Sequence, residues 1–413
     1  MLSFVLVVIM ILSSIPASAL TVLSNDNINS IENTSEKEES EKLIVEEDTS
    51  KRGEFEKHFY CTDGSFVAVM YPEAIHYKDG EEWIDVDNTL TYNSTLNEYV
   101  SSNKNFNVSF SNSLGENKLI SLKKNGYELS WTLETVSSGT PKENSIFLSN
   151  TNSIDSTTAK ITVDNEKVSD KINSIRTEEE AFNLPKVTSK IKYSDAFGNN
   201  QKLDLDYTVY QNKVEEDIIL TEKSDISSFV LRMNTNGLIA ILNSDNSISF
   251  VDNKNEIKYT ISIPYMCDAV DAVSHNIKVD IQQNGSNCVI SYIPDKDWLN
   301  SADRVYPILL DPSITTNEYN AAITDTYVQQ GDSLNHSSEQ KFYVGIKSGN
   351  ICRTYIKFSL PHIDSTMPIN NAAFVITVPA GTTTGRTFGL YRCNSAWRVD
   401  EIAYDYCHGI IKL

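Results

Sequence analysis

The sequence predicts an all-β fold made of tandem antiparallel β-sandwich modules. Apolar and polar residues alternate with a period of two in several segments, most clearly where Leu203, Leu205 and Tyr207 are separated by polar residues. Such alternation is typical of a strand with one face on a core and the other in water. Turns rich in Asn, Asp, Gly and Ser separate these short segments, as expected for strands in antiparallel order.

Further strands follow the same pattern. Alternation recurs at 106–110, 248–250 and 257–263, so the region 237–264 is predicted to be a meander. Two more alternating segments, 277–281 and 288–292, flank Asn284-Gly285. That dipeptide is a strong short-range signal for a β-hairpin because both residues adopt positive φ readily.

Changes in composition divide the chain into successive segments. The predicted boundaries are 1–19, a signal peptide; 20–53, a disordered acidic spacer; 54–133, a first β unit; 134–186, a connecting segment with a helical stretch near 168–182; 187–312, a second β unit; and 313–413, an incomplete last module. The spacer is assigned because its few apolar residues cannot offset the entropy cost of folding. Pro312 ends a buried-looking strand and marks the last boundary.

The N-terminus has the features of an export signal. Residues 2–15 are apolar, and Ala17 and Ala19 suit signal-peptidase cleavage before Leu20. The run is shorter than the roughly 20 residues that span a bilayer, so cleavage is favoured over the alternative, an N-terminal anchor. We therefore expect a secreted, extracellular protein, free or on the cell wall, with no membrane span after cleavage.

The net charge and the absence of known catalytic motifs limit the classes of function that the sequence supports. The 413 residues contain 35 Lys and Arg against 56 Asp and Glu, a net charge of −21, which argues against a nucleic-acid partner. No nucleophile elbow, phosphate-binding loop, zinc-protease motif or dinucleotide-binding motif is present. The six histidines and six cysteines show no metal-ligand spacing, and buried thiols are favoured over disulfides. These observations predict a protein that is not an enzyme.

Carboxylates on strands offer two weaker interpretations. Asp204 and Asp206, like Asp85 and Asp87, stand roughly 7 Å apart along a strand, a spacing that a glycosidase pair also has. We interpret them as solvated strand faces. No cofactor is expected, although a structural calcium ion held by Asp325, Asp332 and Asp364 stays open.

Motifs of the last module resemble the start of a DNRLRE domain. The matching stretches are 325–328, 342–345, 353–361, 372–375 and Trp397 with 401–402. DNRLRE domains are jelly-roll-like β-sandwich modules of secreted bacterial proteins, grouped with carbohydrate-binding modules. The resemblance covers 322–406, lacks the hexapeptide that names the family, and lacks its closing strands, so the module is expected to be truncated.

The upstream region adds a second resemblance. The stretches 57–60, 63–66, 71–80, 83–90 and 306–312 are similar to the N-terminal region of clostridial wall-associated proteins that carry RHS/YD repeats. This resemblance implies a cell-surface protein.

Exposed aromatic residues in the last module suggest a sugar-binding face, since sugar rings stack on Tyr and Trp. The candidate ligand-binding residues are Arg353, Tyr355, Lys357, Tyr391 and Trp397. Packing in the core is the alternative for the aromatic ones. With the resemblance, these residues predict a non-catalytic protein that binds wall or host polysaccharide. The alternative is a structural N-terminal region that displays or encapsulates a downstream RHS/YD-repeat toxin or adhesin.

Overall fold

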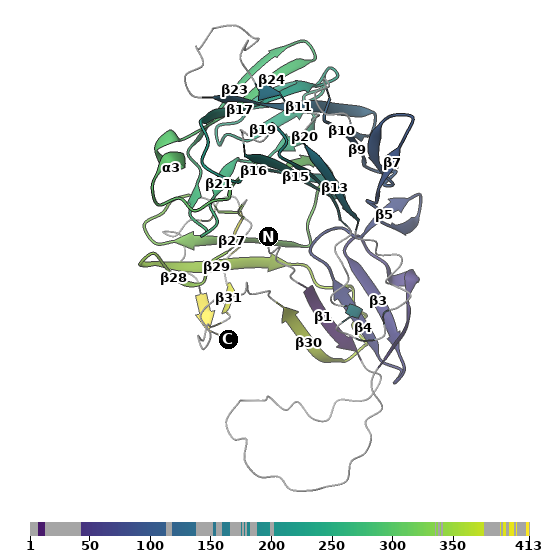
Figure 1. Cartoon of the computed structure of the whole chain (residues 1–413). Helices are drawn as coiled ribbons and strands as arrows, with labels where there is room; N and C mark the ends of the chain where they lie inside the picture. The colour runs from purple at the N-terminus through teal and green to yellow at the C-terminus, as the bar shows by residue number, and fades with distance from the viewer. Residues whose placement is uncertain are drawn as a thin grey trace.

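Antiparallel strands form almost all of the regular structure, which confirms the predicted all-β class (Figure 1). The computed structural model describes residues 7–12, 43–112, 118–137, 152–153, 159–165, 175, 177, 180–181, 188–198, 202–334, 336–337, 339, 342–375, 389, 391–393, 396–399, 402 and 410–412. In these ranges the helices are too short or too polar to cross a membrane. The helix expected near 168–182 lies mostly outside the described residues.

The first large sheet joins segments that are far apart in the chain. Its order is β23-β24-β17-β11-β10-β9-β8-β7, with β12 beside β11. The bounds are β7 Leu90–Asn93, β8 Glu98–Ser101, β9 Asn107–Ser111, β10 Ile120–Lys124, β11 Tyr127–Ser137, β12 Asn152–Ser153, β17 Ile226–Asn234, β23 Ile277–Asn284 and β24 Asn287–Pro294. The segments expected to form a first and a second β unit therefore share one sheet through the β11–β17 pairing.

The second large sheet has the order β13-β14-β15-β16-β26-β20-β19-β18. β25 also pairs with β16 and with β21, which pairs with β22. The bounds are β13 Lys160–Asn165, β14 Ser189–Ser194, β15 Leu203–Tyr210, β16 Lys213–Leu220, β18 Ile239–Leu242, β19 Ile248–Val251, β20 Ile257–Ile261, β21 Tyr265–Cys267, β22 Val273–Ser274, β25 Ile308–Asp311 and β26 Ile314–Thr316. The consecutive pairing of β18, β19 and β20 confirms the predicted meander.

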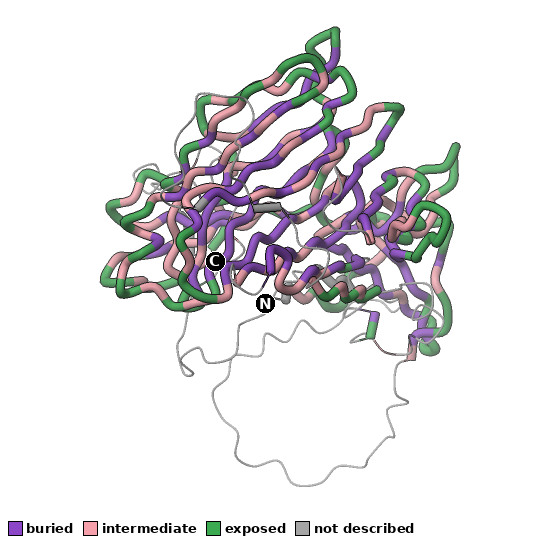
Figure 2. Tube along the Cα trace, turned by 45° about the horizontal axis from the view of Figure 1, so that its top comes forward, coloured by how far each residue is buried: buried purple, intermediate pink, exposed green. Residues whose placement is uncertain are grey.

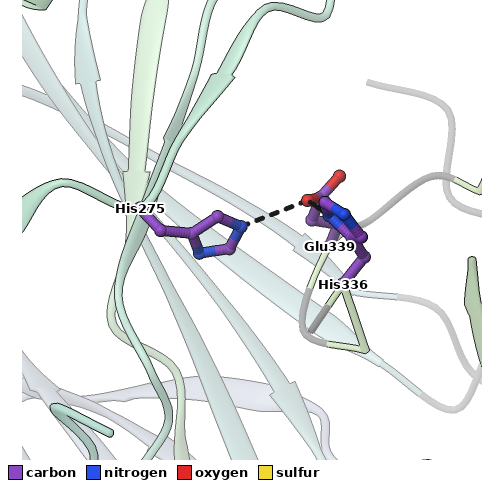
Figure 3. Close-up of side chains that lie close together, drawn as sticks. All are labelled: His275, His336 and Glu339. Carbon is purple, nitrogen blue, oxygen red and sulfur yellow. Dashed lines mark hydrogen bonds and ion pairs between the residues drawn. The ribbon is translucent and has the colours of Figure 1, made fainter. Parts of the chain in front are cut away.

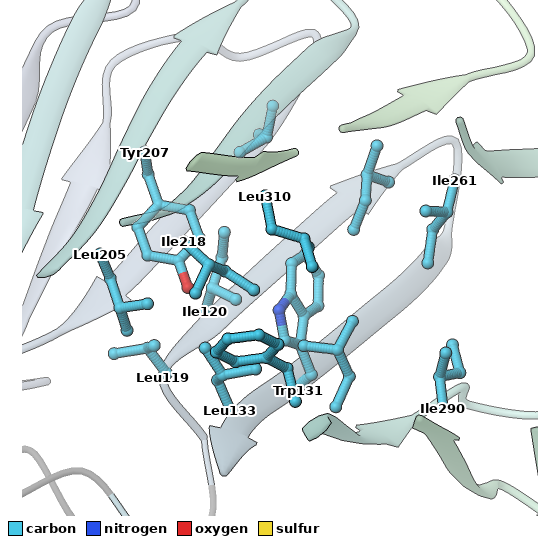
Figure 4. Packing of buried hydrophobic residues seen from close by; sticks show 14 of the residues in the cluster. Leu119, Ile120, Trp131, Leu133, Leu205, Tyr207, Ile218, Ile261, Ile290 and Leu310 are labelled. Carbon is cyan, nitrogen blue, oxygen red and sulfur yellow. The ribbon is translucent and has the colours of Figure 1, made fainter. Parts of the chain in front are cut away.

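Apolar side chains from both large sheets form one shared core (Figure 4). Trp131 and Leu133 of β11 pack in the same cluster as Leu205 of β15, Ile218 of β16 and Leu310 of β25, and all five are fully buried. The burial pattern follows the alternation in sequence, and exposed residues gather at the turns (Figure 2). The predicted hairpin is confirmed as well, since β23 and β24 pair across Gly285, which has φ of 59°.

Smaller sheets complete the structure. A five-stranded sheet has the order β2-β3-β4-β1-β30, a three-stranded sheet the order β27-β29-β28, and β5-β6 and β31-β32 form two-stranded sheets. The bounds are β1 Val7–Leu12, β2 Ile44–Glu47, β3 Glu56–Cys61, β4 Phe66–Met70, β5 His76–Asp79, β6 Glu82–Asp85, β27 Ile323–Gln329, β28 Gly345–Lys347, β29 Asn350–Phe358, β30 Ile369–Val375, β31 Tyr391–Cys393 and β32 Ile410–Lys412. Two short helices lie entirely within the described ranges, η1 Thr49–Lys51 and α3 Lys296–Asn300.

One segment differs from the sequence-based expectation. Residues 43–53 were expected to belong to the disordered spacer, yet they form β2 and η1, because Ile44 is buried and Glu47 has cationic partners. In the last module, strand β30 pairs with β1, in the sheet that also contains β3 and β4.

A buried charge network holds the β2 and β6 regions against β3. The fully buried Lys57 Nζ of β3 lies 3.0 Å from Glu47 Oε1 and 2.8 Å from Asp85 Oδ1. Arg52 contacts the same two carboxylates, at 2.7 Å and 3.0 Å. The Lys57 Nζ is also 3.0 Å from His76 Nε2. A buried charge is tolerated only when it is paired in this way.

Replacement of this buried lysine should destabilise the protein. Lys57→Met leaves the buried side chain of Glu47 and the half-buried Asp85 with Arg52 as their shared cation, and removing one member of a buried pair costs about 3 kcal/mol. Chemical denaturation followed by circular dichroism measures the loss. Lys278→Met is the matched control, because that lysine is 68% exposed and its ion pair should contribute less than about 0.5 kcal/mol. Equal stability of wild type and Lys57→Met would contradict the role of the network.

One carboxyl group lies inside the main core. Glu216 of β16 is fully buried, and the hydroxyl of Tyr207, its cross-strand neighbour on β15, donates to its Oε1 at 2.6 Å. Burial raises the pKa of Glu216 to about 7, because the ionised form loses its hydration. The protonated form is therefore favoured in the folded state at mildly acidic pH.

This raised pKa predicts a pH-dependent stability. The folded state holds the Glu216 proton more tightly than the unfolded state, so its contribution falls as pH rises from the ordinary glutamate value through about 7. Glu216→Gln should abolish this term. Relative to the variant, the wild type should lose about 2 to 3 kcal/mol of unfolding free energy between pH 5 and pH 8. Parallel pH dependences in denaturant titrations would show that Glu216 does not titrate in this range.

Candidate functional site

The two large sheets form what we call the main sandwich, and the three-stranded sheet β27-β29-β28 is called the last sheet. Two histidines and a glutamate lie close together where the main sandwich contacts the last sheet (Figure 3). His275 lies between β22 and β23, whereas His336 and Glu339 lie in the connection between β27 and β28. The His275 Nε2 is 3.2 Å from Glu339 Oε1, and the His336 Nδ1 is 2.5 Å from the same oxygen. In the described part of the chain this is one of two groups whose ligand-type atoms all lie within 4.8 Å of one another.

Neighbouring side chains orient this His–Glu cluster, by which we mean His275, His336 and Glu339. The Tyr327 hydroxyl donates to Glu339 Oε2 at 2.8 Å, and its ring stacks on His336 with centroids 4.0 Å apart. Lys347 donates in turn to the Tyr327 hydroxyl at 3.3 Å. The His336 Nε2 faces Asp332 Oδ2 at 3.5 Å.

The cluster is nearly closed to solvent. The side chains of Glu339, His336 and His275 are 3%, 5% and 13% exposed. Burial alone would raise the pKa of Glu339, but hydrogen bonds from His275 and His336 outweigh it and lower this pKa to about 2. Glu339 is therefore an ionised acceptor over the whole physiological range. An imidazole pair and one carboxylate can transfer protons or ligate a metal ion.

A second group consists only of carboxylates. Glu215 and Asp217 of β16 and Asp311 of β25 have oxygen atoms within 4.8 Å of one another. Burial, with Glu215 nearby, raises the pKa of Asp311 to about 6, and burial beside Asp311 raises the pKa of Asp217 well above its usual value. The Ser313 backbone and hydroxyl donate to Asp311, and Tyr210 donates to Glu215. Lys213 opposes these shifts, so a nearby cation and the raised carboxyl pKa values together compensate the charge of this group.

The five residues expected to bind a ligand do not form an open aromatic face. Tyr355 of β29 is buried, and its ring meets the half-buried Trp397 edge to face, with centroids 5.7 Å apart. Arg353 and Lys357 flank Tyr355 on the same strand, half-buried and exposed respectively. Tyr391 of β31 is 43% exposed. Tyr355 and Trp397 thus bury their rings against each other, which leaves little of the Tyr355 ring for stacking.

The three carboxylates considered as calcium ligands lie in separate environments. Asp325 of β27 is half-buried, and burial raises its pKa to about 6. Asp332 accepts from the Leu334 amide, and Asp364 accepts from the Thr366 amide and hydroxyl. Within the described residues these three carboxylates do not converge on one point.

Comparison with known proteins finds no matching family model, but it does find relatives. The tRNA(Glu)-specific nuclease WapA of Bacillus subtilis subspecies natto and the tRNA nuclease WapA of Bacillus subtilis are each 24% identical over 369 residues, which cover 83% of this chain. The tRNA3(Ser)-specific nuclease WapA of Bacillus spizizenii is 24% identical over 311 residues, or 73% of the chain. The chain spans only 12% to 14% of the length of these relatives.

These relatives overturn several predictions from the sequence. The resemblance to DNRLRE-domain and clostridial RHS/YD-repeat proteins is wrong, since no family model matches and the relatives found are Bacillus WapA nucleases. The predictions of a non-catalytic polysaccharide binder, of no enzyme and of no nucleic-acid partner are contradicted by relatives named for tRNA cleavage. The charge argument took the net charge of the 413 residues as excluding a nucleic-acid partner, but a net charge does not describe any one surface of a protein. The predicted location outside the cell agrees with the relatives.

Sequence reasoning missed the His–Glu cluster altogether. His275 and Glu339 are 64 residues apart, so no short motif contains them. The only local signal is the His336-x-x-Glu339 spacing, which is too common to indicate a site by itself. The cluster forms because two connections from different sheets meet.

The ionised Glu339 should make the junction sensitive to acid. Its folded-state pKa of about 2 lies below the ordinary value of 4.5, so its contribution is present above pH 4.5 and is lost as pH falls toward 2. Glu339→Gln should lower the free energy of unfolding by about 2 to 3 kcal/mol at pH 7, a difference that shrinks below pH 4.5. Glu222→Gln is the control, because Glu222 is 66% exposed. A pH-independent difference in urea denaturation would count against this assignment.

Proposed function

We propose that the protein acts as a tRNA-directed nuclease of the WapA kind, and that the described β region is a rigid framework within it. The observation that carries the proposal is the similarity to three WapA nucleases, which extends over 73% to 83% of the chain. A match of that extent runs through both large sheets, so it concerns the architecture as a whole and not one short motif. Because the matched part is 14% of the relatives at most, the nuclease activity is proposed for the whole protein.

The construction of the region supports the framework role. A single buried core connects both large sheets, and the buried Lys57 network braces the sheet that contains β2, β3 and β4. Such cores are close-packed and rigid on the time average. The His–Glu cluster is poorly placed to cleave RNA. Its three side chains are at most 13% exposed, and both imidazoles contact one carboxylate oxygen instead of facing each other across a phosphate site.

We also propose that the protein acts at the cell wall. The apolar N-terminal residues followed by Ala17 and Ala19 support export, and the WapA relatives support a place on the wall rather than in the medium. Fractionation of the source cells, probed with an antibody against residues 202–334, distinguishes the two places. Recovery of the protein mainly from the wall fraction is expected, and recovery mainly from the medium would contradict wall association.

The nuclease proposal is tested on the protein as its source organism produces it. Incubation with total tRNA, with and without divalent cations, should yield discrete tRNA fragments resolved on denaturing gels. Glu339→Gln and His275→Asn should cleave at the wild-type rate, because the cluster lies within the framework; heat-unfolded protein is the negative control. Intact tRNA in the presence of folded protein would contradict the nuclease proposal. Loss of cleavage in a folded Glu339→Gln variant would contradict the framework role.

A further inference from the structure

We propose that the His–Glu cluster binds one divalent transition-metal ion, with zinc as the preferred ion. The bound ion would cross-link the main sandwich and the last sheet. The inference does not depend on the nuclease activity. Two imidazoles and one carboxylate form the ligand set that zinc prefers when thiolates are absent. His275 comes from the sandwich, and His336 and Glu339 come from the last module, so an ion bound by all three would cross-link them.

The distances suit such an ion. Zinc lies about 2.0 to 2.2 Å from nitrogen and oxygen ligands, which places tetrahedral ligand atoms roughly 3.3 to 3.5 Å apart. The His275 Nε2 and Glu339 Oε1 are already separated by 3.2 Å. The His336 Nδ1 is 2.5 Å from that oxygen, so the distance between these two atoms must increase by less than about 1 Å. A rotation of the side chain allows this movement. Three protein ligands leave a fourth position for water.

The partners around the cluster match the outer shell that metal ligands need. A ligating histidine usually donates its other nitrogen to a carboxylate, which fixes its tautomer and orientation. If His336 ligates through Nδ1, its Nε2 points at Asp332 Oδ2, 3.5 Å away, and this buried nitrogen has no hydrogen-bond partner within the described residues. The second oxygen of Glu339 is held by the Tyr327 hydroxyl, which leaves Oε1 for the ion.

The charge balance also favours a cation. With neutral imidazoles the cluster has one negative charge from Glu339, and Asp332 adds a second at its edge. Lys347 donates to the Tyr327 hydroxyl, which in turn donates to Glu339, so the phenol lies between this lysine and the carboxylate. An M²⁺ ion would take the place of the direct contacts that both imidazoles make with the carboxylate, at 3.2 Å and 2.5 Å.

Metal titration of the full chain tests the site. The protein is stripped with a chelator, and zinc affinity is measured by competition with a chromophoric chelator. We expect one tight site per chain. His275→Asn and His336→Asn each remove a ligand and should weaken binding at least about 100-fold, whereas Tyr327→Phe, which keeps the stacked ring but loses the hydroxyl, should weaken it about 10- to 100-fold. His362→Asn is the matched control, because His362 is exposed and lies outside the cluster.

Cobalt(II) identifies the ligands. A site of nitrogen and oxygen ligands gives visible d–d bands without the thiolate charge-transfer band that cysteine ligands would produce, and this excludes binding at the cysteines. Circular dichroism of each variant checks that it is folded. The proposal is overturned if the stripped wild type takes up no zinc, if His275→Asn and His336→Asn bind as tightly as wild type, or if the cobalt spectrum shows thiolate ligation.

Discussion

The pairing of β11 with β17 is the interaction on which the rest of the structure depends. It aligns Ser130 with Asn234 and continues to Ser137 and Ile226, so residues about a hundred positions apart become neighbours in one sheet. Without it, β7 to β10 would expose the apolar faces that now pack against β15, β16 and β25. The pairing joins β7 to β11 with β17, β23 and β24 in one sheet, which covers one side of the shared core. Because apolar burial is the main favourable term in folding, the stability of that core depends on this pairing.

Buried ionisable groups occur in three separate parts of the structure. Lys57 joins Glu47 and Asp85 across three strands of the N-terminal region, Glu216 lies inside the main core, and Glu339 joins the sandwich to the last sheet. Each is tolerated because a partner or a proton compensates its charge. The directions of the pKa shifts differ accordingly, since hydrogen-bond donors lower the pKa of Glu339 whereas burial raises the pKa of Glu216.

The functional interpretation changed more than the fold. Tyr355 and Trp397 looked like a sugar-stacking face, but their rings pack against each other. A net charge of −21 suggested that no nucleic acid is involved, yet the relatives are tRNA nucleases. The charge that matters for binding is that of the surface that meets the ligand, and a net charge summed over 413 residues does not describe any one surface.

The sequence by itself determined the local structure. Alternation at Leu203, Leu205 and Tyr207 correctly identified a half-buried strand, and Asn284-Gly285 correctly placed a hairpin, because both signals depend on backbone geometry within a few residues. Only the tertiary structure decided which strands share a sheet and which side chains converge. His275 and Glu339 lie 64 residues apart on connections whose own sequences impose no contact, and they meet because the packing of two sheets brings those connections together.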